Sequence, residues 1–176
     1  MKYKDELIRS MEWLAEKDDT IVIGQSVKYS GNAIYNTVKT LSMKKIMEVP
    51  VFEELQMGIS TGMALEGLVP ISCFPRFDFL LRCVDSLVNH LDKMQVMTDG
   101  NFKPKVIIRT SIGSSKPLNG GVQSTNDYTE PFRQMLTEVD VVLLNEPKEI
   151  FPAFQRAYER EGSSLIVEWG DHYNDK

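Results

Sequence analysis

The sequence has few residues of the kinds that bind transition metals. Its only cysteines are Cys73 and Cys83, and its only histidines are His90 and His172, among 176 residues. The cysteines lack C-x-x-C spacing, so the chain offers no ligand set for zinc, and we expect both to be buried hydrophobic residues. His90 falls within a predicted helix and His172 in the terminal segment. Ser-His-Asp chemistry is therefore poorly supported, and both histidines are expected to have structural or solvent-facing roles.

Long apolar runs and an excess of positive charge are also missing. No segment reaches the ~18 consecutive apolar residues of a membrane span, and residues 1–6 carry acids rather than the apolar core of a signal peptide. The net charge is −5, and its 20 basic and 25 acidic residues are interspersed without a basic stripe. We therefore expect a cytoplasmic protein that binds neither membrane nor nucleic acid.

Phosphate-binding motifs are absent as well. The sequence contains neither G-x-G-x-x-G nor G-x-x-x-x-G-K-[ST]. The run Gly113-Ser114-Ser115-Lys116 has neither the required spacing nor an evident helix after it. If a phosphorylated ligand binds, another chain must hold its phosphates.

The chain does contain a regular alternation of strand-like and helix-like segments within the size of one domain. The strand-like segments are short and apolar and span residues 20–24, 45–49, 69–74, 105–110, 139–144 and 164–169. Helical segments are indicated at residues 7–14, 32–41, 78–97 and 149–160, and another begins at Glu53 and ends before a break at Gly67. This alternation predicts an α/β fold, a three-layer αβα sandwich around a mainly parallel six-stranded sheet.

Ligands of such sheets bind where the carboxyl ends of the strands meet the connecting loops. This directs attention to residues 24–25, 50–53, 74–79 and the long loop 111–127. A loop of that length in a compact domain is usually functional or mobile, although a passive surface connection stays an alternative. In the 78–97 helix the stripe of Leu80, Val84, Leu87 and Leu91 is expected to be core packing.

Glu53 is the candidate working carboxyl, because it begins a predicted helix directly after the apolar Val51 and Phe52. An acid in the first helical turn stabilises the helix dipole by roughly 0.3–1 kcal/mol, which explains it without any function. If it is buried, Glu53 can instead share a proton with a ligand nitrogen. Later in the same helix, Gly58 and Gly62 share a face that permits close approach of another backbone, either within the chain or from a partner.

Several short motifs occur together in a specific order. They are Gly24-Gln25-Ser26-Val27, Val49-Pro50-Val51-Phe52-Glu53, Gly58-x-x-x-Gly62-x-Ala64-x-x-Gly67 and Phe77-Asp78-Phe79. In this order the chain resembles the transketolase-like, pyrimidine-binding domain of thiamine-diphosphate-dependent enzymes. It is most similar to the N-terminal half of the β subunit of 2-oxo acid dehydrogenases of the pyruvate and branched-chain type. The resemblance covers nearly the whole chain, so residues 1–176 are expected to form one such domain.

The resemblance implies roles for three residues. The glutamate that matches Glu53 hydrogen-bonds N1′ of the thiamine diphosphate pyrimidine, which favours the imino tautomer that deprotonates C2 and generates the ylid. Phe77 matches a position whose ring stacks on the aminopyrimidine. Val51 would line the same ring, and for Phe77 and Val51 ordinary core packing stays an alternative. The diphosphate and its Mg²⁺ are held in this family by another domain, often on a separate α-type chain.

The chain also departs from the family pattern. Gln25 replaces an acid near the active-site tunnel, and Val122-Gln123-Ser124 stands where the family has an active-site histidine. Gln123 at this catalytic position can hydrogen-bond but cannot act as an acid or base, so non-oxidative decarboxylation or carboligation is as plausible as acylation of a lipoyl group. Family β subunits continue into a C-terminal transketolase domain, and we expect this protein to lack one. The start at Met1 and the polar residues 171–176 favour a complete chain.

These observations predict the pyrimidine-binding half of a two-chain enzyme that acts on a 2-oxo acid or a ketose and is inactive alone. We expect an α₂β₂-like assembly, with a homodimer when the chain is purified by itself. One alternative is a non-catalytic binding or assembly module that keeps the fold. A flavodoxin-like or other nucleotide-binding α/β domain is a further alternative, and it would bind its cofactor without a second chain.

Overall fold

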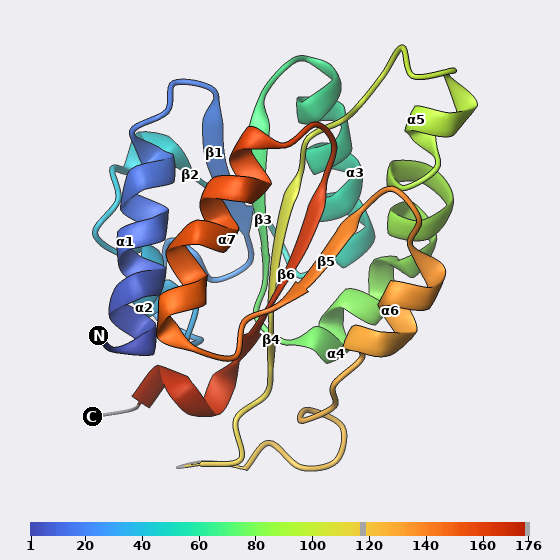
Figure 1. Ribbon diagram of the computed structural model, residues 1–176. Coiled ribbons are helices and arrows are strands. Elements are labelled where there is room, and N and C mark those ends of the chain that lie inside the picture. The colour runs from blue at the N-terminus through green and yellow to red at the C-terminus, as the bar shows by residue number, and fades with distance from the viewer. Residues whose placement is uncertain (117–118, 175–176) are drawn as a thin grey trace.

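A parallel sheet forms the centre of the protein. The computed structural model describes residues 1–116 and 119–174, and in this part of the chain the strands follow the order β2-β1-β3-β4-β6-β5 (Figure 1). The strands are β1 (Thr20–Gly24), β2 (Ile46–Glu48), β3 (Val69–Phe74), β4 (Ile107–Ile112), β5 (Asp140–Leu143) and β6 (Ser164–Trp169). Every pairing is parallel, which confirms the predicted six-stranded sheet.

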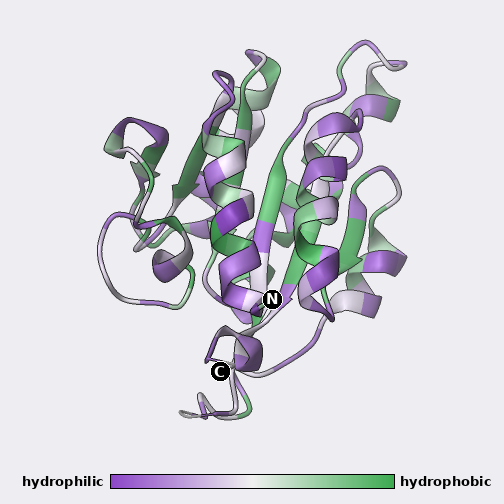
Figure 2. Cartoon of the chain, turned by 60° about the vertical axis from the view of Figure 1, so that its left-hand side comes forward, coloured by the Kyte–Doolittle hydropathy of each residue, from purple (hydrophilic) through white to green (hydrophobic). Residues whose placement is uncertain are grey.

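Helices cover both faces of the sheet and complete the predicted three layers. One face carries α1 (Tyr3–Ala15), α2 (Tyr35–Val38) and α7 (Pro147–Glu159). The other carries α3 (Glu53–Leu65), α4 (Phe77–Leu80), the 3₁₀ turn η2 (Leu81–Cys83), the π-helical turn η3 (Ser86–Leu91) and α6 (Thr129–Met135). Figure 2 shows the strands as a largely hydrophobic layer between helices with hydrophilic outer surfaces. Strands β3 and β4 are buried at every position, as expected for central parallel strands.

The predicted helix 78–97 is wrong as a single element. The segment is divided into α4, η2, η3 and α5 (Met94–Met97). In the π turn the N–H of Asp92 donates to the carbonyl of Leu87 at 2.9 Å, which widens the helix just before Asp92. The Asp92 carboxylate there accepts the backbone N–H groups that lead into β5, and apolar periodicity does not report such a contact. The predicted core stripe is correct, since Leu80, Leu87 and Leu91 are buried.

Two further differences concern the loops. Helix α6 was not predicted, and it begins where Asp127 Oδ1 accepts the N–H of Thr129 at 2.8 Å. Strand β4 extends to Ile112, so the predicted loop 111–127 is shorter at its start. The helical segment expected at 32–41 contains only the four-residue α2. None of the helices in the described part of the chain has the length and hydrophobicity of a membrane-spanning segment.

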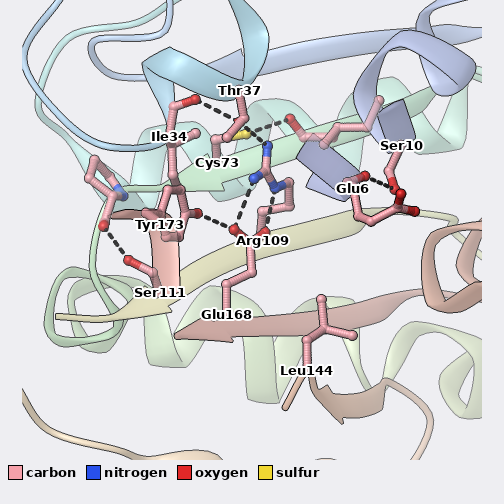
Figure 3. Close-up of polar contacts among 12 residues, drawn as sticks. Glu6, Ser10, Ile34, Thr37, Cys73, Arg109, Ser111, Leu144, Glu168 and Tyr173 are labelled. Carbon is pink, nitrogen blue, oxygen red and sulfur yellow. Dashed lines mark hydrogen bonds and ion pairs between the residues drawn. The ribbon is translucent and has the colours of Figure 1, made fainter. Parts of the chain in front are cut away.

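A fully buried ion pair joins the neighbouring strands β4 and β6 on the α1 side of the sheet (Figure 3). Arg109 on β4 donates from Nε and Nη2 to the two carboxylate oxygens of Glu168 on β6, at 2.6 and 2.9 Å. Its Nη1 donates to Thr37 of α2 at 3.1 Å, and the hydroxyl of Tyr173 donates to Glu168. Burial and the nearby Glu168 charge raise the pKa of Tyr173, so it remains a donor. The pair thereby attaches α2 and the C-terminal turn η4 (Gly170–Asn174) to the sheet.

The surroundings of the cysteines and histidines agree with structural or solvent-facing roles. Both cysteines are buried, as predicted, and burial raises the pKa of Cys73 to about 11 and that of Cys83 to about 12. His90 is exposed, with Nε2 at 3.4 Å from Asp85. The ring of His172 packs 5.3 Å from that of Tyr3.

Candidate cofactor and substrate site

A cavity of about 340 Å³ lies at the carboxyl edge of the sheet, the lower edge in Figure 1. Residues that follow three neighbouring strands line it, together with the start of η4. The polar and aromatic residues that line it are Gln25, Ser26, Asn32, Arg76, Phe79, Ser111 and Ser114. A volume above about 300 Å³ suits a small organic ligand.

Glu53 lies beside this cavity as the first residue of α3, and only 7% of it is exposed. Its Oε1 accepts a hydrogen bond from Nε2 of Gln25 at 3.1 Å. Among the described residues no cation pairs with this carboxylate, and no donor reaches its Oε2. The local sequence left a helix-dipole role and a buried functional role open, and the burial of Glu53 favours the second. A buried carboxylate with one neutral donor can still accept a hydrogen bond from a ligand.

Gln25 connects Glu53 to the cavity, because it lines the cavity and also donates to the carboxylate. The loop that follows it is held by Glu48, the last residue of β2. The Glu48 carboxylate accepts the backbone N–H groups of Ser26, Val27 and Lys28 at 2.5, 2.9 and 2.8 Å. Sequence reasoning missed Glu48, although an acid that ends a buried strand beside another strand's loop is a usable signal.

Two aromatic residues near the site, Phe77 and Phe79, lie in different surroundings. Phe77 is fully buried in the core, with its ring stacked 5.2 Å from that of Phe132 and edge-on to Tyr128 at 5.6 Å. This agrees with the core-packing alternative for Phe77, and stacking of its ring on a cofactor stays a prediction. Phe79, two residues later, is 37% exposed and lines the cavity. Two aromatics at i and i+2 of a helix point in different directions, and the sequence alone did not indicate which faces inward.

Val51 and Gln123 are not brought to the cavity. Val51 is 77% exposed between β2 and α3, and it does not line the cavity. Gln123 is exposed on the loop before α6 and is also absent from the lining. Apolar lining by Val51 and catalysis by Gln123 therefore stay predictions, and both would require contact with a second chain or a different loop position.

The described parts of the 111–127 loop are attached at both ends. Asp171 of η4 accepts the backbone N–H groups of Ser115 and Lys116 at 2.6 and 3.0 Å. Near the other end, Asn126 donates to Asp78 of α4 at 2.7 Å. Gly113 lies so close to Ser124 that a Cβ would fall 1.6 Å from the Ser124 carbonyl oxygen. The loop therefore closes back on itself and contributes Gly113 and Ser114 to the cavity.

Within residues 1–116 and 119–174, no three His, Cys, Asp or Glu side chains are placed to hold a metal ion. The lining of the cavity can contribute amides, hydroxyls, an aromatic face and one guanidinium to a ligand, and Glu53 adds a carboxylate beside Gln25.

The outward face of α3 has no neighbour at Gly58 or Gly62 among residues 1–116 and 119–174. A Cβ added at Gly58 or Gly62 would meet nothing within 4 Å, so the glycines do not serve packing within the chain. Leu55 and Leu65 lie on the same face at helical spacing and are 42% and 40% exposed. We call Leu55, Gly58, Gly62 and Leu65 the α3 outer face. The alternative that these glycines pack inside the chain is wrong.

Comparisons with known proteins identify the family. A family model for the pyrimidine binding domain of transketolase matches residues 8–172. The β subunit of the mitochondrial pyruvate dehydrogenase E1 component of Saccharomyces cerevisiae is 30% identical over 123 residues, which cover 67% of this chain and 32% of that protein. The β subunit of 2-oxoisovalerate dehydrogenase of Pseudomonas aeruginosa is 24% identical over 134 residues, 74% of this chain and 37% of that protein.

Among solved structures, a split-gene transketolase described as an inactive β₄ tetramer matches with a TM-score of 0.60 and 16% identity. The match covers 95% of this chain and 49% of that one, and it supports the fold. The chain spans about a third of the length of the curated relatives it matches. Since the family model covers almost all of its residues, this chain belongs to the transketolase pyrimidine-binding domain family of thiamine-diphosphate-dependent enzymes.

Proposed function

We propose that this chain is the pyrimidine-binding half of a two-chain thiamine-diphosphate-dependent enzyme that acts on a 2-oxo acid or a ketose. The observation that carries the proposal is the buried Glu53 carboxylate, held by Gln25 beside a cavity at the carboxyl edge of the sheet. Bound thiamine diphosphate would supply a carbon nucleophile at C2 of its thiazolium ring. Decarboxylation, dehydrogenation and carboligation all fit this chemistry.

Three residues of this chain would serve the cofactor. Glu53 would accept a hydrogen bond from the protonated pyrimidine N1′, a role that its single neutral donor leaves open. Gln25 would hold the Glu53 carboxylate in place, since its own loop is fixed by Glu48. Phe79, in place of Phe77, would present its exposed ring to the aminopyrimidine.

The diphosphate and Mg²⁺ would be held by an α-type partner chain. The sequence has no phosphate-binding loop, and the described residues form no cluster of metal-ligating side chains. The α3 outer face supports an additional chain, because its glycines and leucines lie open to solvent on the helix that begins with Glu53. We infer a β–β or β–α contact on this face, and activity only in the assembled enzyme.

The test is hydrogen–deuterium exchange at C2 of thiamine diphosphate, followed by NMR on this protein co-expressed with the chain encoded beside it. We expect the pair to accelerate exchange and Glu53→Gln to abolish most of that acceleration, because the amide cannot share the N1′ proton in the same way. Removing a positioned acid/base group typically costs 10²–10⁴-fold, so a loss of about 100-fold is expected. Glu54→Gln is the matched control, since Glu54 is adjacent and exposed.

Two results would contradict the proposal. One is exchange that Glu53→Gln leaves unchanged. The other is a pair that forms a stable complex and binds the cofactor without accelerating exchange, which would indicate the non-catalytic assembly module instead. Binding of cofactor by this chain alone, with phosphate contacts of its own, would favour the nucleotide-binding alternative.

A further inference from the structure

The cavity contains one charge, and it is positive. Of the residues that line the cavity in the described chain, Arg76 alone carries a charge, and the others are serines, glutamine, asparagine, glycines, alanine, proline and phenylalanine. The chain as a whole has five more acidic than basic residues. In this acid-rich protein the described lining thus holds a guanidinium and no carboxylate, and the Glu53 carboxylate lies behind Gln25.

Arg76 has no partner for its charge within residues 1–116 and 119–174. No hydrogen bond, ion pair or stacking contact of its guanidinium is formed with these residues, although the side chain is partly buried. By contrast, the fully buried Arg109 donates from Nε and Nη2 to both carboxylate oxygens of Glu168. Because partly desolvated guanidinium groups favour an anionic partner, the unpaired Arg76 indicates that a ligand supplies one.

The guanidinium of Arg76 packs against the backbone at Gly120. A Cβ at Gly120 would lie 2.9 Å from Nη1 of Arg76 and 3.4 Å from Cζ, so the glycine permits this close approach. Arg76 also precedes α4, which carries Phe79 into the same cavity. The guanidinium thus lies in the cavity lining between the end of β3 and Gly120. A guanidinium can bind two oxygens of one anion through two parallel hydrogen bonds.

We propose that Arg76 binds a second, non-reacting anionic group of the substrate, a carboxylate or a phosphate, and so selects substrates with a charged tail. The inference rests on the proposed function for its assignment to a substrate. A 2-oxo acid loses its reacting carboxylate as neutral carbon dioxide, and a guanidinium on that carboxylate would stabilise the ground state. An arginine in this cavity would therefore assist the reaction more by binding a group of the substrate that keeps its negative charge throughout the reaction.

The first test measures binding and needs no cofactor. The full chain is labelled with ¹⁵N-arginine and titrated with glutarate or inorganic phosphate, with glutaramide as the neutral control, while the Nε–Hε signal of Arg76 is followed by NMR. We expect the anions to shift this signal and glutaramide to leave it unchanged. In Arg76→Gln the anion affinity measured at the backbone amides of Gly113 and Ser114 should fall roughly 10–100-fold, as for loss of charged hydrogen bonds. Arg76→Lys should retain part of it.

The matched control is Arg156→Gln, which removes the same charge from an exposed arginine on α7, away from the cavity. It should leave the anion affinity unchanged. Anions that do not shift the Arg76 signal, or that shift the Arg156 signal equally, would overturn the proposal. Preference for glutarate would assign a carboxylate, and preference for phosphate would assign a phosphorylated substrate.

The second test uses the assembled enzyme. Rates with 2-oxoglutarate and 2-oxopentanoate, and with xylulose 5-phosphate and xylulose, compare a charged with an uncharged tail. We expect Arg76→Gln to lower kcat/KM for the charged member of one pair by roughly 10–100-fold and to leave cofactor C2 exchange unchanged. Equal losses for both members would contradict selection by Arg76. Absence of C2 exchange in the unaltered enzyme would instead contradict the proposed function, and the NMR titration would still decide whether the cavity binds an anion.

Discussion

The contribution of the buried Arg109–Glu168 pair to stability depends on the surroundings of its two charges. Both side chains are fully buried, and Glu168 also accepts the Tyr173 hydroxyl. Two charges removed from water gain little over a well-packed apolar pair, but a single charge left behind is costly. The pair is therefore better described as a device that orients α2 and η4 than as a source of net stability.

We predict that Glu168→Gln lowers the free energy of unfolding by about 3–5 kcal/mol, because it leaves the Arg109 charge buried beside a neutral amide. The double variant Arg109→Met with Glu168→Leu should lose much less than the sum of the two single changes. Urea unfolding measures all of them. Glu130→Gln is the control, since its ion pair with Arg133 is exposed and should contribute less than about 1 kcal/mol. Equal losses at the buried and exposed pairs would contradict the prediction.

At the site, the residue type could be predicted and the side-chain direction could not. Glu53 was found because an acid after apolar residues at a helix start is visible in sequence, and its burial agrees with a functional role. Phe77 and Phe79 are equivalent in sequence, and only packing against Phe132 shows that Phe77 belongs to the core. Arg76 was missed because the absence of a partner is a property of three-dimensional surroundings.

At the scale of elements, Asp92 holds the end of η3 to the segment that enters β5. Its side chain is fully buried and accepts the backbone N–H groups of Thr137, Glu138 and Val139 at 2.8–3.1 Å, and Lys93 pairs with it at 2.7 Å. Burial acts to raise the pKa of Asp92, but the hydrogen bonds from Lys93 and these donors outweigh burial, so the pKa is lowered from 3.8. The native state therefore favours the ionised form.

This lowered pKa predicts an acid dependence of stability. A carboxylate whose pKa is lower in the folded state contributes stability that is complete above its unfolded pKa of 3.8. The contribution declines as the pH falls below 3.8 and is lost below the folded pKa. We expect the difference in unfolding free energy between the unaltered protein and Asp92→Asn to be largest near neutral pH and to shrink below pH 3.8. Urea unfolding at several pH values measures it, and a constant difference would contradict the assignment.

The strands were predictable because each is a short apolar run bounded by polar residues, and parallel sheets bury both faces of such strands. The helices on the α4 side were less predictable. Apolar spacing located the buried Leu80, Leu87 and Leu91, but the π turn before Asp92 depends on contacts with residues more than forty positions later. Helix α6 begins two residues after Asp127, whose carboxylate accepts the N–H of Thr129, a short signal within a stretch that otherwise resembles a loop.

At the scale of the whole molecule, the α3 outer face is the clearest indication of a larger assembly. Its glycines are solvent-exposed in a chain that spans about a third of its curated relatives. Glycine in a helix costs roughly 0.5–1 kcal/mol relative to alanine, so two glycines without neighbours are a stability cost that the chain itself does not offset. Close approach of a helix from another chain would explain both positions.

Substitutions at Gly62 should affect the stability of the isolated chain and its association differently. In the isolated chain, Gly62→Ala should raise the free energy of unfolding by about 0.5–1 kcal/mol, and Gly62→Leu should not lower it, because nothing lies within 4 Å of the added Cβ. In the assembly, the leucine side chain would occupy the space of the neighbouring helix, so Gly62→Leu should weaken association measured by sedimentation velocity. Arg156→Leu on α7 adds the same side chain at another exposed position and should leave association intact. If Gly62→Leu assembles as well as the unaltered chain, the α3 outer face is not the contact surface, and the open glycines require another explanation.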